Sequence, residues 1–390
     1  MVDNPTKIYN DYVRANLPNS MSYDTGTDRY DINNHSFFKF KNSNWYFNYI
    51  SKYGYSAFSA YAVNGFEPAL VFDFKGNYFR KSATDSTFGA SITHARASSA
   101  TMVNASGNLV TVGNNVPRTG HHIYNGSAWV NEGILHESEA RTNLLLNSGT
   151  LSTQSATVAA VANTISFTGT GTVTLSGVST AGPLVGTGTG ENNRVNLTFT
   201  PTAGTLTLTV SGTVTNAQLE AGATPSSYIP TAGASATRAA ETLTVPAANL
   251  PYDNTNMSIQ IDGKITYADS GSTNTALPWR WRVDNNNIIY NRFSTSGSRT
   301  GQPQFLQGST SSGIDSVVGG NNVYSPNTNV PFNLAGRYGS TFINGAHEGT
   351  LLTANTTPTS LPALSSTDLE LGQLFMGTIG QFRMWSDDLG

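Results

Sequence analysis

Short stretches that alternate apolar and polar residues, each ended by Gly, Pro or Ser, fill residues 156–214. Alternation with a period of two places one set of side chains on the buried face of a β-strand and the other set in water. Threonine occupies most of the polar positions, and its β-branched side chain favours strands without adding charge. Regular short strands between such turns are typical of a β-sandwich or a jelly roll. The expected strands are residues 164–168, 172–176, 195–199 and 205–210.

Strand patterns also precede and follow this region. Two hairpins are expected before it, one over residues 101–112 and one in which Tyr124 and Trp129 flank a glycine-containing turn. A further set of apolar strands begins near residue 254, after the prolines at 246 and 251. We therefore expect an all-β protein in three parts. These are an N-terminal segment of residues 1–65, a central β-sandwich or jelly-roll domain of residues 66–248, and a C-terminal β-sandwich of residues 249–390.

The composition argues against several classes of function. The sequence has 390 residues, a formal net charge of −3 and no cysteine. A surface that binds nucleic acid needs a surplus of Lys and Arg, and disulfides or thiolate metal sites need cysteine. No run of about 18 apolar residues is present, so we expect no membrane insertion. The first residues are polar and lack a basic head before an apolar stretch, so we expect no secretory signal.

Three charged residues, Glu137, Glu139 and Arg141, lie between the apolar runs 134–135 and 144–146. Charged residues make up only 12% of the sequence, so such a group between apolar flanks indicates partial burial. A desolvated carboxylate needs a partner, and Arg is suited to it because its guanidinium donates two parallel hydrogen bonds. We interpret the stretch as a structural charge cluster. The alternative is a polar turn between two strands.

Aromatic residues crowd the end of the N-terminal segment, over residues 37–61. Phe38 and Phe40 alternate with lysines there, as in a strand with one polar face. Tyr and Trp suit contact surfaces because they bury a large area and keep a polar tip. Two interpretations stay open, a small aromatic core and a face that attaches this chain to a larger particle.

Alternating tryptophans and arginines occur on one expected strand of the C-terminal region. Trp279 and Trp281 share one face of that strand, and Arg280 and Arg282 share the other. A pair of indole rings makes a flat apolar platform suited to a sugar ring, and arginines in a groove suit an acidic polysaccharide. With Trp385, these residues are our candidate carbohydrate-binding set. The alternative is that the tryptophans form the core and the arginines face water.

No arrangement typical of catalysis or metal binding stands out. A hydrolase of this sandwich class needs two carboxylates that converge from alternate positions of a strand, whereas the acidic residues here are scattered. They are Asp262, Asp269, Asp284, Asp315, Glu348 and Glu370. The adjacent His121 and His122 point to opposite faces of a strand, so they share a metal only if the chain bends there; in an oligomer, one histidine per chain could converge on an axis and bind an ion. We expect no enzyme activity, no cofactor and no metal site.

Three sequence blocks occur in order between residues 66 and 245. The first runs from Arg-Ala-Ser-Ser-Ala-Thr at 96–101 to Asn-Val-Pro-Arg at 115–118, and the second contains Glu-Ala-Arg-Thr-Asn-Leu-Leu-Leu-Asn-Ser at 139–148. The third holds Ala-Gln-Leu-Glu-Ala-Gly-Ala at 217–223, Ser-Tyr-Ile-Pro-Thr at 227–231 and Thr-Arg-Ala-Ala-Glu at 237–241. Together they resemble the head spike fibre family of bacteriophages and gene-transfer agents. Residues 377–389 likewise resemble the closing strands of concanavalin-like, laminin-G-like sandwiches, and Phe-Ile-Asn-Gly at 342–345 resembles a hairpin of the same domains.

The resemblance implies a virion structural protein, a head spike or tail fibre, that is assembled in the host cytoplasm and displayed on the phage particle. It implies adhesion to host surface polysaccharide and a homo-oligomer, most commonly a trimer, joined to other virion proteins through the N-terminal segment. A purely structural decoration or connector protein is the first alternative, and it predicts that Trp279 and Trp281 are buried. A polysaccharide depolymerase is the second, and it predicts two convergent carboxylates in a groove.

Overall fold

The computed structural model describes residues 61–63, 66–82, 84–266, 275–309, 313–324 and 326–389, together with the backbone of four strands nearer the N-terminus. Those four are β1 (Asp28–Asp31), β2 (Ser36–Lys41), β3 (Asn44–Ser51) and β4 (Gly54–Phe58), paired in that order as one antiparallel sheet. The chain divides into two compact units, residues 1–69 with 389–390 and residues 70–388. The predicted aromatic attachment face lies outside the side chains that the structure describes.

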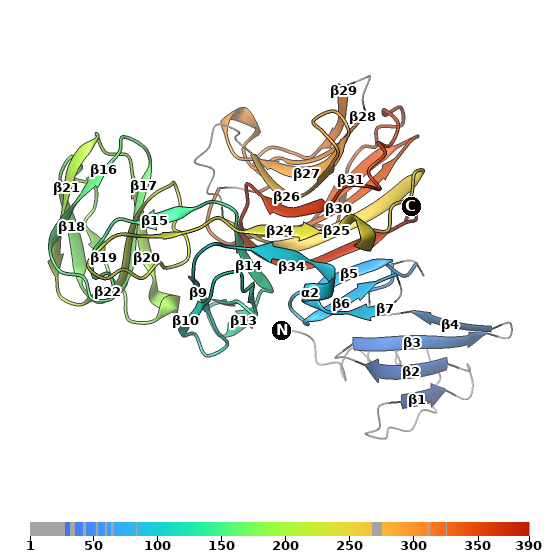
Figure 1. Cartoon of the computed structure of the whole chain (residues 1–390), viewed down its shortest axis with the longest axis horizontal. Helices are drawn as coiled ribbons and strands as arrows, with labels where there is room; N and C mark the ends of the chain where they lie inside the picture. The colour runs from blue at the N-terminus through green and yellow to red at the C-terminus, as the bar shows by residue number, and fades with distance from the viewer. Residues whose placement is uncertain are drawn as a thin grey trace. The chain divides into compact units, whose positions relative to one another are not determined.

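Residues 70–388 contain a large two-sheet sandwich, which we call the main sandwich (Figure 1). Its first sheet has the order β32-β31-β30-β25-β34-β5-β6-β7, and β14 joins it by pairing with β34 and with β11. The strands are β5 (Leu70–Asp73), β6 (Tyr78–Lys81), β7 (Thr84–Ser86), β11 (Arg118–Thr119), β14 (Ile134–Glu137), β25 (Asn256–Ile265), β30 (Val330–Gly339), β31 (Ile343–His347), β32 (Thr350–Leu351) and β34 (Met376–Trp385).

The second sheet of the main sandwich has the order β29-β28-β27-β26-β33-β24-β8. Its strands are β8 (Thr93–Ala95), β24 (Thr242–Val245), β26 (Thr275–Arg282), β27 (Ile288–Ser294), β28 (Pro303–Ser309), β29 (Gly313–Val318) and β33 (Leu369–Gln373). One apolar core lies between the sheets and draws side chains from both, among them Phe72, Ile261, Trp279 and Phe382. Burial of this apolar surface is the main force that holds the two sheets together.

A second, smaller sandwich is inserted between β14 and β24, and we call it the inserted sandwich. Its sheets have the orders β16-β21-β18-β19 and β20-β17-β22 around a separate apolar core. The strands are β16 (Gln154–Val158), β17 (Asn163–Gly169), β18 (Thr172–Gly177), β19 (Leu184–Val185), β20 (Val195–Phe199), β21 (Gly204–Ser211) and β22 (Val214–Ala221). The chain leaves the main sandwich through β15 (Arg141–Asn143) and returns through β23 (Ala236–Arg238), and these two strands pair with each other.

Two short hairpins precede β14, and both were expected. One consists of β9 (Ala100–Val103) and β10 (Leu109–Val112), the other of β12 (His122–Tyr124) and β13 (Trp129–Asn131). Helical structure in the described ranges is limited to α2 (Phe88–Ser91) and the short 3-10 turns η1 (Glu191–Asn193), η2 (Ala247–Asn249) and η3 (Gly297–Arg299). None of the helices in these ranges is long and apolar enough to cross a membrane.

The predicted all-β class is confirmed, but strand pairing differs from the predicted division at residue 249. β5 and β14 pair with β34, and β24 pairs with β33, so strands from the predicted central domain complete both sheets of the main sandwich. Residues 249–390 therefore do not build a sandwich by themselves. Local alternation identifies a strand, whereas the choice of its partner depends on hydrogen bonds to a strand far away in the sequence.

Candidate functional site

A buried ion cluster lies where the chain leaves and re-enters the main sandwich. Its centre is Glu241, between β23 and β24, which is only 2% exposed. Arg118 donates to the Glu241 carboxylate from Nε at 3.0 Å and from Nη2 at 2.7 Å. Arg96 donates to it from Nη1, and the backbone N–H of Glu137 donates at 2.8 Å. The carboxylate thus holds β11, β14 and the segment after β8 at one point.

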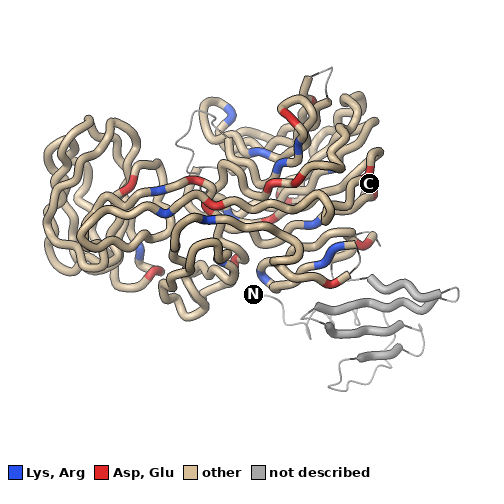
Figure 2. The backbone as a smooth tube through the Cα atoms, viewed as in Figure 1, with Lys and Arg blue, Asp and Glu red and all other residues tan. Residues whose placement is uncertain are grey.

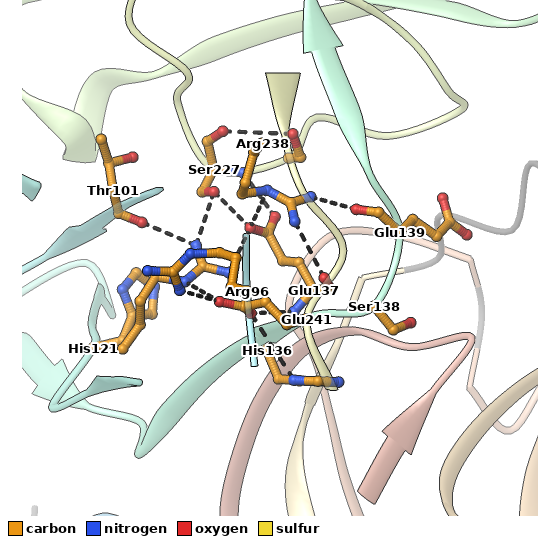
Figure 3. Close-up of polar contacts among 12 residues, drawn as sticks. Arg96, Thr101, His121, His136, Glu137, Ser138, Glu139, Ser227, Arg238 and Glu241 are labelled. Atoms are coloured by element: carbon orange, nitrogen blue, oxygen red, sulfur yellow. Dashed lines mark hydrogen bonds and ion pairs between the residues drawn. The ribbon is translucent and has the colours of Figure 1, made fainter. Parts of the chain in front are cut away.

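Glu137 is the second carboxylate of the cluster. Arg118 Nη2 lies 2.8 Å and Arg238 Nε 3.0 Å from Glu137 Oε2. The backbone N–H and the hydroxyl of Ser227 donate to its two oxygens, as Figure 3 shows. Arg238 Nη2 also donates to the carbonyl of Glu139 at 2.7 Å. The cluster therefore joins β14, β23 and the loop that carries Ser227.

Burial and charge act in opposite directions on these groups. Burial alone would raise the pKa of Glu137, but Arg238 and Arg118 outweigh it and lower that pKa to about 2. The pKa of Glu241 is lowered for the same reason, with Arg118 as the strongest partner. Burial lowers the pKa of His136, whose Nδ1 lies 3.9 Å from Glu241, to about 4. Both carboxylates are therefore ionised at neutral pH, and His136 is neutral.

The three residues of the predicted charge cluster do not form one group. Arg141 pairs with Glu139, whereas Glu137 belongs to the buried ion cluster. Arg141 Nη2 lies 2.8 Å from Glu139 Oε2, and Arg141 also donates to the carbonyl of Ala221 in the inserted sandwich. Glu137 is held instead by arginines from other parts of the sequence. Arg118, Arg238 and Glu241 all lie in the first and third of the blocks quoted above, and their shared occurrence there was the available signal that they meet.

A cleft opens beside this cluster, and we call it the hairpin cleft. It has a volume of about 300 Å³ and lies between the β12–β13 hairpin, the η1 end of the inserted sandwich and the main sandwich. Its walls include Val103, His121, His122, Tyr124, Trp129, Glu137, Glu191, Asn192, Arg194, Asn196, Ser226, Ser227, Tyr228, Thr328, Asn329 and Met376. The lining thus combines hydroxyl, amide and aromatic groups with aliphatic side chains, among them Met102, Leu109, Ile123 and Leu135.

Two aromatic side chains form one wall of the hairpin cleft. Tyr124 and Trp129 are opposed across the β12–β13 pair, with ring centroids 5.3 Å apart and ring planes at 53°. Tyr124 is 37% exposed and Trp129 is partly exposed. Gly107, with φ +79°, lies directly against the indole, where any larger side chain would collide with it. The hairpin thus presents a fixed aromatic surface to the cleft.

The floor of the hairpin cleft is a serine loop held by two carboxylates. Glu220, fully buried in β22, accepts hydrogen bonds from the N–H of Ser226 at 2.8 Å and from its hydroxyl at 2.6 Å. Glu137 accepts the corresponding pair from Ser227. One carboxylate comes from the inserted sandwich and the other from the main sandwich. The loop is consequently fixed before any ligand arrives.

His121 and His122 lie at the same cleft and have different surroundings. Burial and the nearby Arg118 lower the pKa of His121 to about 3, and its Nδ1 accepts a hydrogen bond from the N–H of Val103 at 3.2 Å. His122 Nδ1 donates to the carbonyl of Gly120 at 2.8 Å. Within the described ranges, no group of three or more acidic or histidine side chains is arranged to hold a metal ion.

The predicted tryptophan platform is not on the surface. Trp279 and Trp281 are fully buried and Trp385 is 1% exposed. The indole N–H of Trp279 donates to Asn291 Oδ1, and its ring meets Tyr338 edge-on at 5.5 Å. These side chains fill the core of the main sandwich and cannot stack on a sugar. Alternation showed that the strand has two faces, but not which of them would be covered by the first sheet.

The predicted arginine partners of that platform lie on the other face of β26. Arg280 is paired with Glu370 of β33, and Arg282 donates to Asn285 in the adjoining turn at 2.8 Å. Arg282 and Glu370 line a shallow surface hollow with Asp284 and Asp368. These arginines therefore lie on the face of β26 away from the core; Arg282 is partly exposed, and the Arg280 side chain is 11% exposed. The partly exposed tryptophan is Trp129, which the sequence marked only as a hairpin residue.

No protein-family model matches this sequence, and no curated protein matches it. Among solved structures, a leech intramolecular trans-sialidase complexed with 2,7-anhydro-Neu5Ac aligns at 14% identity and a TM-score of 0.28. That alignment covers 35% of this chain and only 22% of the leech protein.

Two other solved structures are lectin-like β-sandwich domains. The Ruminococcus gnavus IT-sialidase CBM40 bound to α2,3-sialyllactose aligns at 11% identity and a TM-score of 0.27, over 35% of this chain and 78% of that chain. Domains LG4-5 of the mouse laminin α1 chain align at 10% identity and a TM-score of 0.25, over 64% of this chain and 86% of that chain. Scores and identities this low carry no argument for function, and the fold class stands on the strand order given above.

Proposed function

We propose that this protein binds a host surface polysaccharide through the hairpin cleft, as a component displayed on the surface of a phage particle. The observation that carries the binding proposal is the aromatic wall of Tyr124 and Trp129 beside a cleft of about 300 Å³. A partly exposed indole offers a flat apolar face to the C–H groups of a sugar ring, while nearby hydroxyls and amides bond its hydroxyls.

The rigidity of the cleft supports binding. Ser226 and Ser227 are each held by a buried carboxylate, and Thr101 fixes the next residue by donating to the carbonyl of Tyr228 at 2.6 Å. A surface fixed in its binding conformation loses little conformational entropy when a ligand arrives. Flexible saccharides already lose much entropy on binding, so a fixed site favours their capture.

The virion assignment rests on the three sequence blocks. The blocks supply Arg96, Arg118, Arg238 and Glu241 of the buried ion cluster, and Ser227 and Tyr228 of the third block line the cleft. Residues from separate blocks therefore meet in one part of the structure. This is what we expect if the blocks together mark one recurrent fibre domain. With this assignment we propose a homo-oligomer, most simply a trimer, attached to other virion proteins through residues 1–65.

We propose binding without hydrolysis. Glu137 and Glu191 are the carboxylates in the described lining of the hairpin cleft. A glycosidase of the usual kind needs one carboxylic acid that is protonated near neutral pH. The pKa of Glu137 is instead lowered to about 2 by Arg238 and Arg118, so Glu137 has no proton to donate.

A structural connector without a glycan ligand is the second candidate. The observation in its favour is the burial of Trp279 and Trp281, which this alternative predicted. If the protein is such a connector, no ligand binds in the hairpin cleft. The two candidates therefore differ in one measurable property, whether the folded chain binds polysaccharide at Trp129.

The test is binding of the full chain to an array of neutral and acidic bacterial surface glycans, with released reducing ends assayed in parallel. Trp129→Ala should weaken binding about tenfold or more, as expected for an aromatic residue central to a site, and Trp129→Phe should retain most of it. Leu351→Ala is the matched control, because Leu351 is an apolar side chain 70% exposed on β32 that does not line the cleft.

Thermal melting of each variant separates lost binding from lost folding. Absence of glycan binding by the folded wild-type chain would refute the adhesin proposal in favour of the connector. Binding that survives Trp129→Ala would refute the hairpin cleft as its site.

A further inference from the structure

The inserted sandwich contributes an ion pair to the hairpin cleft. Residues 144–235 contain only three charged residues, and Figure 2 shows how sparse charge is along this part of the chain. Glu220 is buried beneath the serine loop, whereas Glu191 and Arg194 both line the cleft. Arg194 Nη1 lies 3.7 Å from Glu191 Oε2. Two of the three charged residues of the inserted sandwich, Glu191 and Arg194, therefore line the cleft, and together they form a neutral pair.

Arg194 is held in place from several sides. Its Nη2 donates to Ser166 Oγ at 2.8 Å and its Nη1 to the carbonyl of Asn216 at 3.3 Å. The guanidinium also lies over the ring of Tyr228, 5.6 Å from the centroid. A side chain fixed by two strands and an aromatic ring cannot swing out to meet a distant anion. It acts instead as a fixed donor at the edge of the cleft.

Each member of the pair keeps one unused hydrogen-bonding atom. Arg194 Nε and Glu191 Oε1 are buried and have no hydrogen-bond partner among the described residues. The Glu191 side chain is only 10% exposed, so an unmet acceptor there is costly. The terminal torsion of a glutamate is soft, and a small rotation turns Oε1 toward the cleft. A carboxylate oxygen turned in this way accepts a hydrogen bond from a ligand hydroxyl, whereas Arg194 Nε stays buried.

The charge balance of the cleft excludes a carboxylate ligand from this position. The charged groups in its described lining are Glu137, Glu191 and Arg194. Glu137 is neutralised by Arg118 and Arg238, and Arg194 by Glu191. An acidic sugar would find no unpaired cation in this lining, whose two carboxylates and one guanidinium leave it with a net negative charge. Like charges in a partly desolvated site repel strongly.

A second hollow of about 280 Å³ continues the hairpin cleft, and we call it the side groove. The two share Asn196, Pro225 and Thr328. The described lining of the side groove is Asn196, Ala223, Thr224, Pro225, Thr295, Pro326, Asn327 and Thr328 and contains no charged side chain. The hydroxyl of Thr224 is another buried group without a hydrogen-bond partner among the described residues. The side groove thus adds a second hollow of similar volume to the hairpin cleft, and its described lining is uncharged.

We propose that the hairpin cleft and side groove take a neutral, hydroxyl-rich oligosaccharide and discriminate against acidic saccharides, with the Glu191–Arg194 pair as the selecting element. This inference rests on the proposed function, because it names the chemical class of the glycan bound at the same site. It departs from the sequence-based expectation that arginines would select an acidic polysaccharide. The selecting arginine is in the inserted sandwich and its charge is already balanced.

The test compares binding of the full chain to neutral and acidic members of one glycan array, and to one polymer in two charge states. Homogalacturonan provides that polymer, since its highly methyl-esterified form is neutral and its de-esterified form is a polyanion. The wild-type chain should favour neutral glycans and the esterified polymer by about tenfold, and its binding should be insensitive to salt. Glu191→Gln, which removes the negative member of the pair, should raise the acidic-to-neutral binding ratio roughly fivefold.

Glu370→Gln is the matched control, because Glu370 forms a comparable pair with Arg280 away from the cleft. This variant should leave the ratio unchanged. Preference for acidic glycans that is lost in Trp129→Ala would overturn this inference and leave the proposed function standing. An unchanged ratio in Glu191→Gln would likewise remove Glu191 as the selecting residue. No binding of any glycan, or binding independent of Trp129, would overturn the proposed function and this inference together.

Discussion

Replacing Glu241 by Gln removes the central negative charge of the buried ion cluster and keeps the shape of the side chain. In the native protein the Glu241 carboxylate accepts hydrogen bonds from Arg96, from two nitrogens of Arg118 and from the backbone N–H of Glu137. A glutamine retains one acceptor oxygen and turns an N–H₂ donor toward an arginine donor. Three buried guanidiniums, those of Arg96, Arg118 and Arg238, are then left with the single carboxylate of Glu137.

The size of the effect follows from burial. Removing one partner from a buried ion pair costs about 3–5 kcal/mol, because the remaining charge stays in the interior without compensation. In a unit of this size each kcal/mol lowers the melting temperature by about 2 °C. Glu241→Gln should therefore melt roughly 6–10 °C below the wild-type chain. The loss should appear in the unit of residues 70–388, whose strands meet at this cluster.

Calorimetry of the full chain measures the shift, with Glu370→Gln as the control. Glu370 pairs with Arg280 at a side-chain exposure of 38%, so its loss should cost less than about 1 kcal/mol. A Glu241→Gln variant that melts within 2 °C of wild type would refute the cluster as a stabilising centre, a threshold set by roughly 1 kcal/mol. Equal losses in both variants would refute the argument from burial.

Three further predictions concern pH, the Arg141 pair and the core. His121 and His136 have pKa values lowered to about 3 and about 4, so below pH 6.5 the unfolded chain binds more protons and stability falls. The free energy of unfolding, measured by denaturant titration, should therefore decrease by about 1.4 kcal/mol per pH unit for each histidine, and His136→Gln should halve that slope; a flat profile from pH 7 to pH 5 would contradict this. Arg141→Ala loses the bonds to Glu139 and Ala221 and should destabilise the fold or its assembly by about 2 kcal/mol, whereas unchanged melting and oligomer size would show the pair to be dispensable. Trp279→Ala leaves a cavity at a fully buried site and should lower the free energy of unfolding by about 3–5 kcal/mol, while the folded protein binds glycan as before. Weakened glycan binding without a loss of stability would instead support Trp279 as an exposed sugar-binding residue.

Strand positions in this chain follow from local sequence. The threonine-rich alternation predicted strands at 172–176 and 205–210, and they appear as β18 and β21, packed around the core of the inserted sandwich. The hairpin turns were equally visible, because glycine and asparagine occupy the turn positions between β9 and β10 and between β12 and β13. The alternation of buried and exposed residues and the residue preferences of turns each involve only a few consecutive residues. Both signals can therefore be recognised in a short stretch of sequence.

Ion-pair partners and strand partners that are far apart in the sequence could not be predicted in the same way. Arg141 was the predicted partner of the nearby glutamates, yet Glu137 bonds Arg118 and Arg238, which β11 and β23 bring to it. Ion pairing over long sequence distances depends on strand order, which alternation does not contain. The order itself was missed where β5 and β14 join β34.

The candidate site could not be predicted from the sequence for the same reason, because it is built from residues that are far apart in the chain. Trp129 and Tyr124 were recognised as hairpin residues, but the cleft beside them also needs Glu191 and Arg194 from the inserted sandwich. A tryptophan next to a tight turn is a usable signal, because side chains at hairpin ends have few neighbours to cover them. Trp279 and Trp281 lack that signal and lie on the central strand of the second sheet, on the face that packs into the core between the sheets.

Trp129 is the one tryptophan among the described residues that is not buried, which makes the central claim directly measurable by fluorescence. The full chain and its Trp129→Phe variant are titrated with the glycan that binds best on the array, and their emission spectra are subtracted. Our account predicts a glycan-dependent change in intensity and wavelength in the wild-type chain that is absent from Trp129→Phe, although that variant still binds. An identical spectral change in both proteins, or none in a wild-type chain that binds the glycan, would contradict carbohydrate binding at the hairpin cleft.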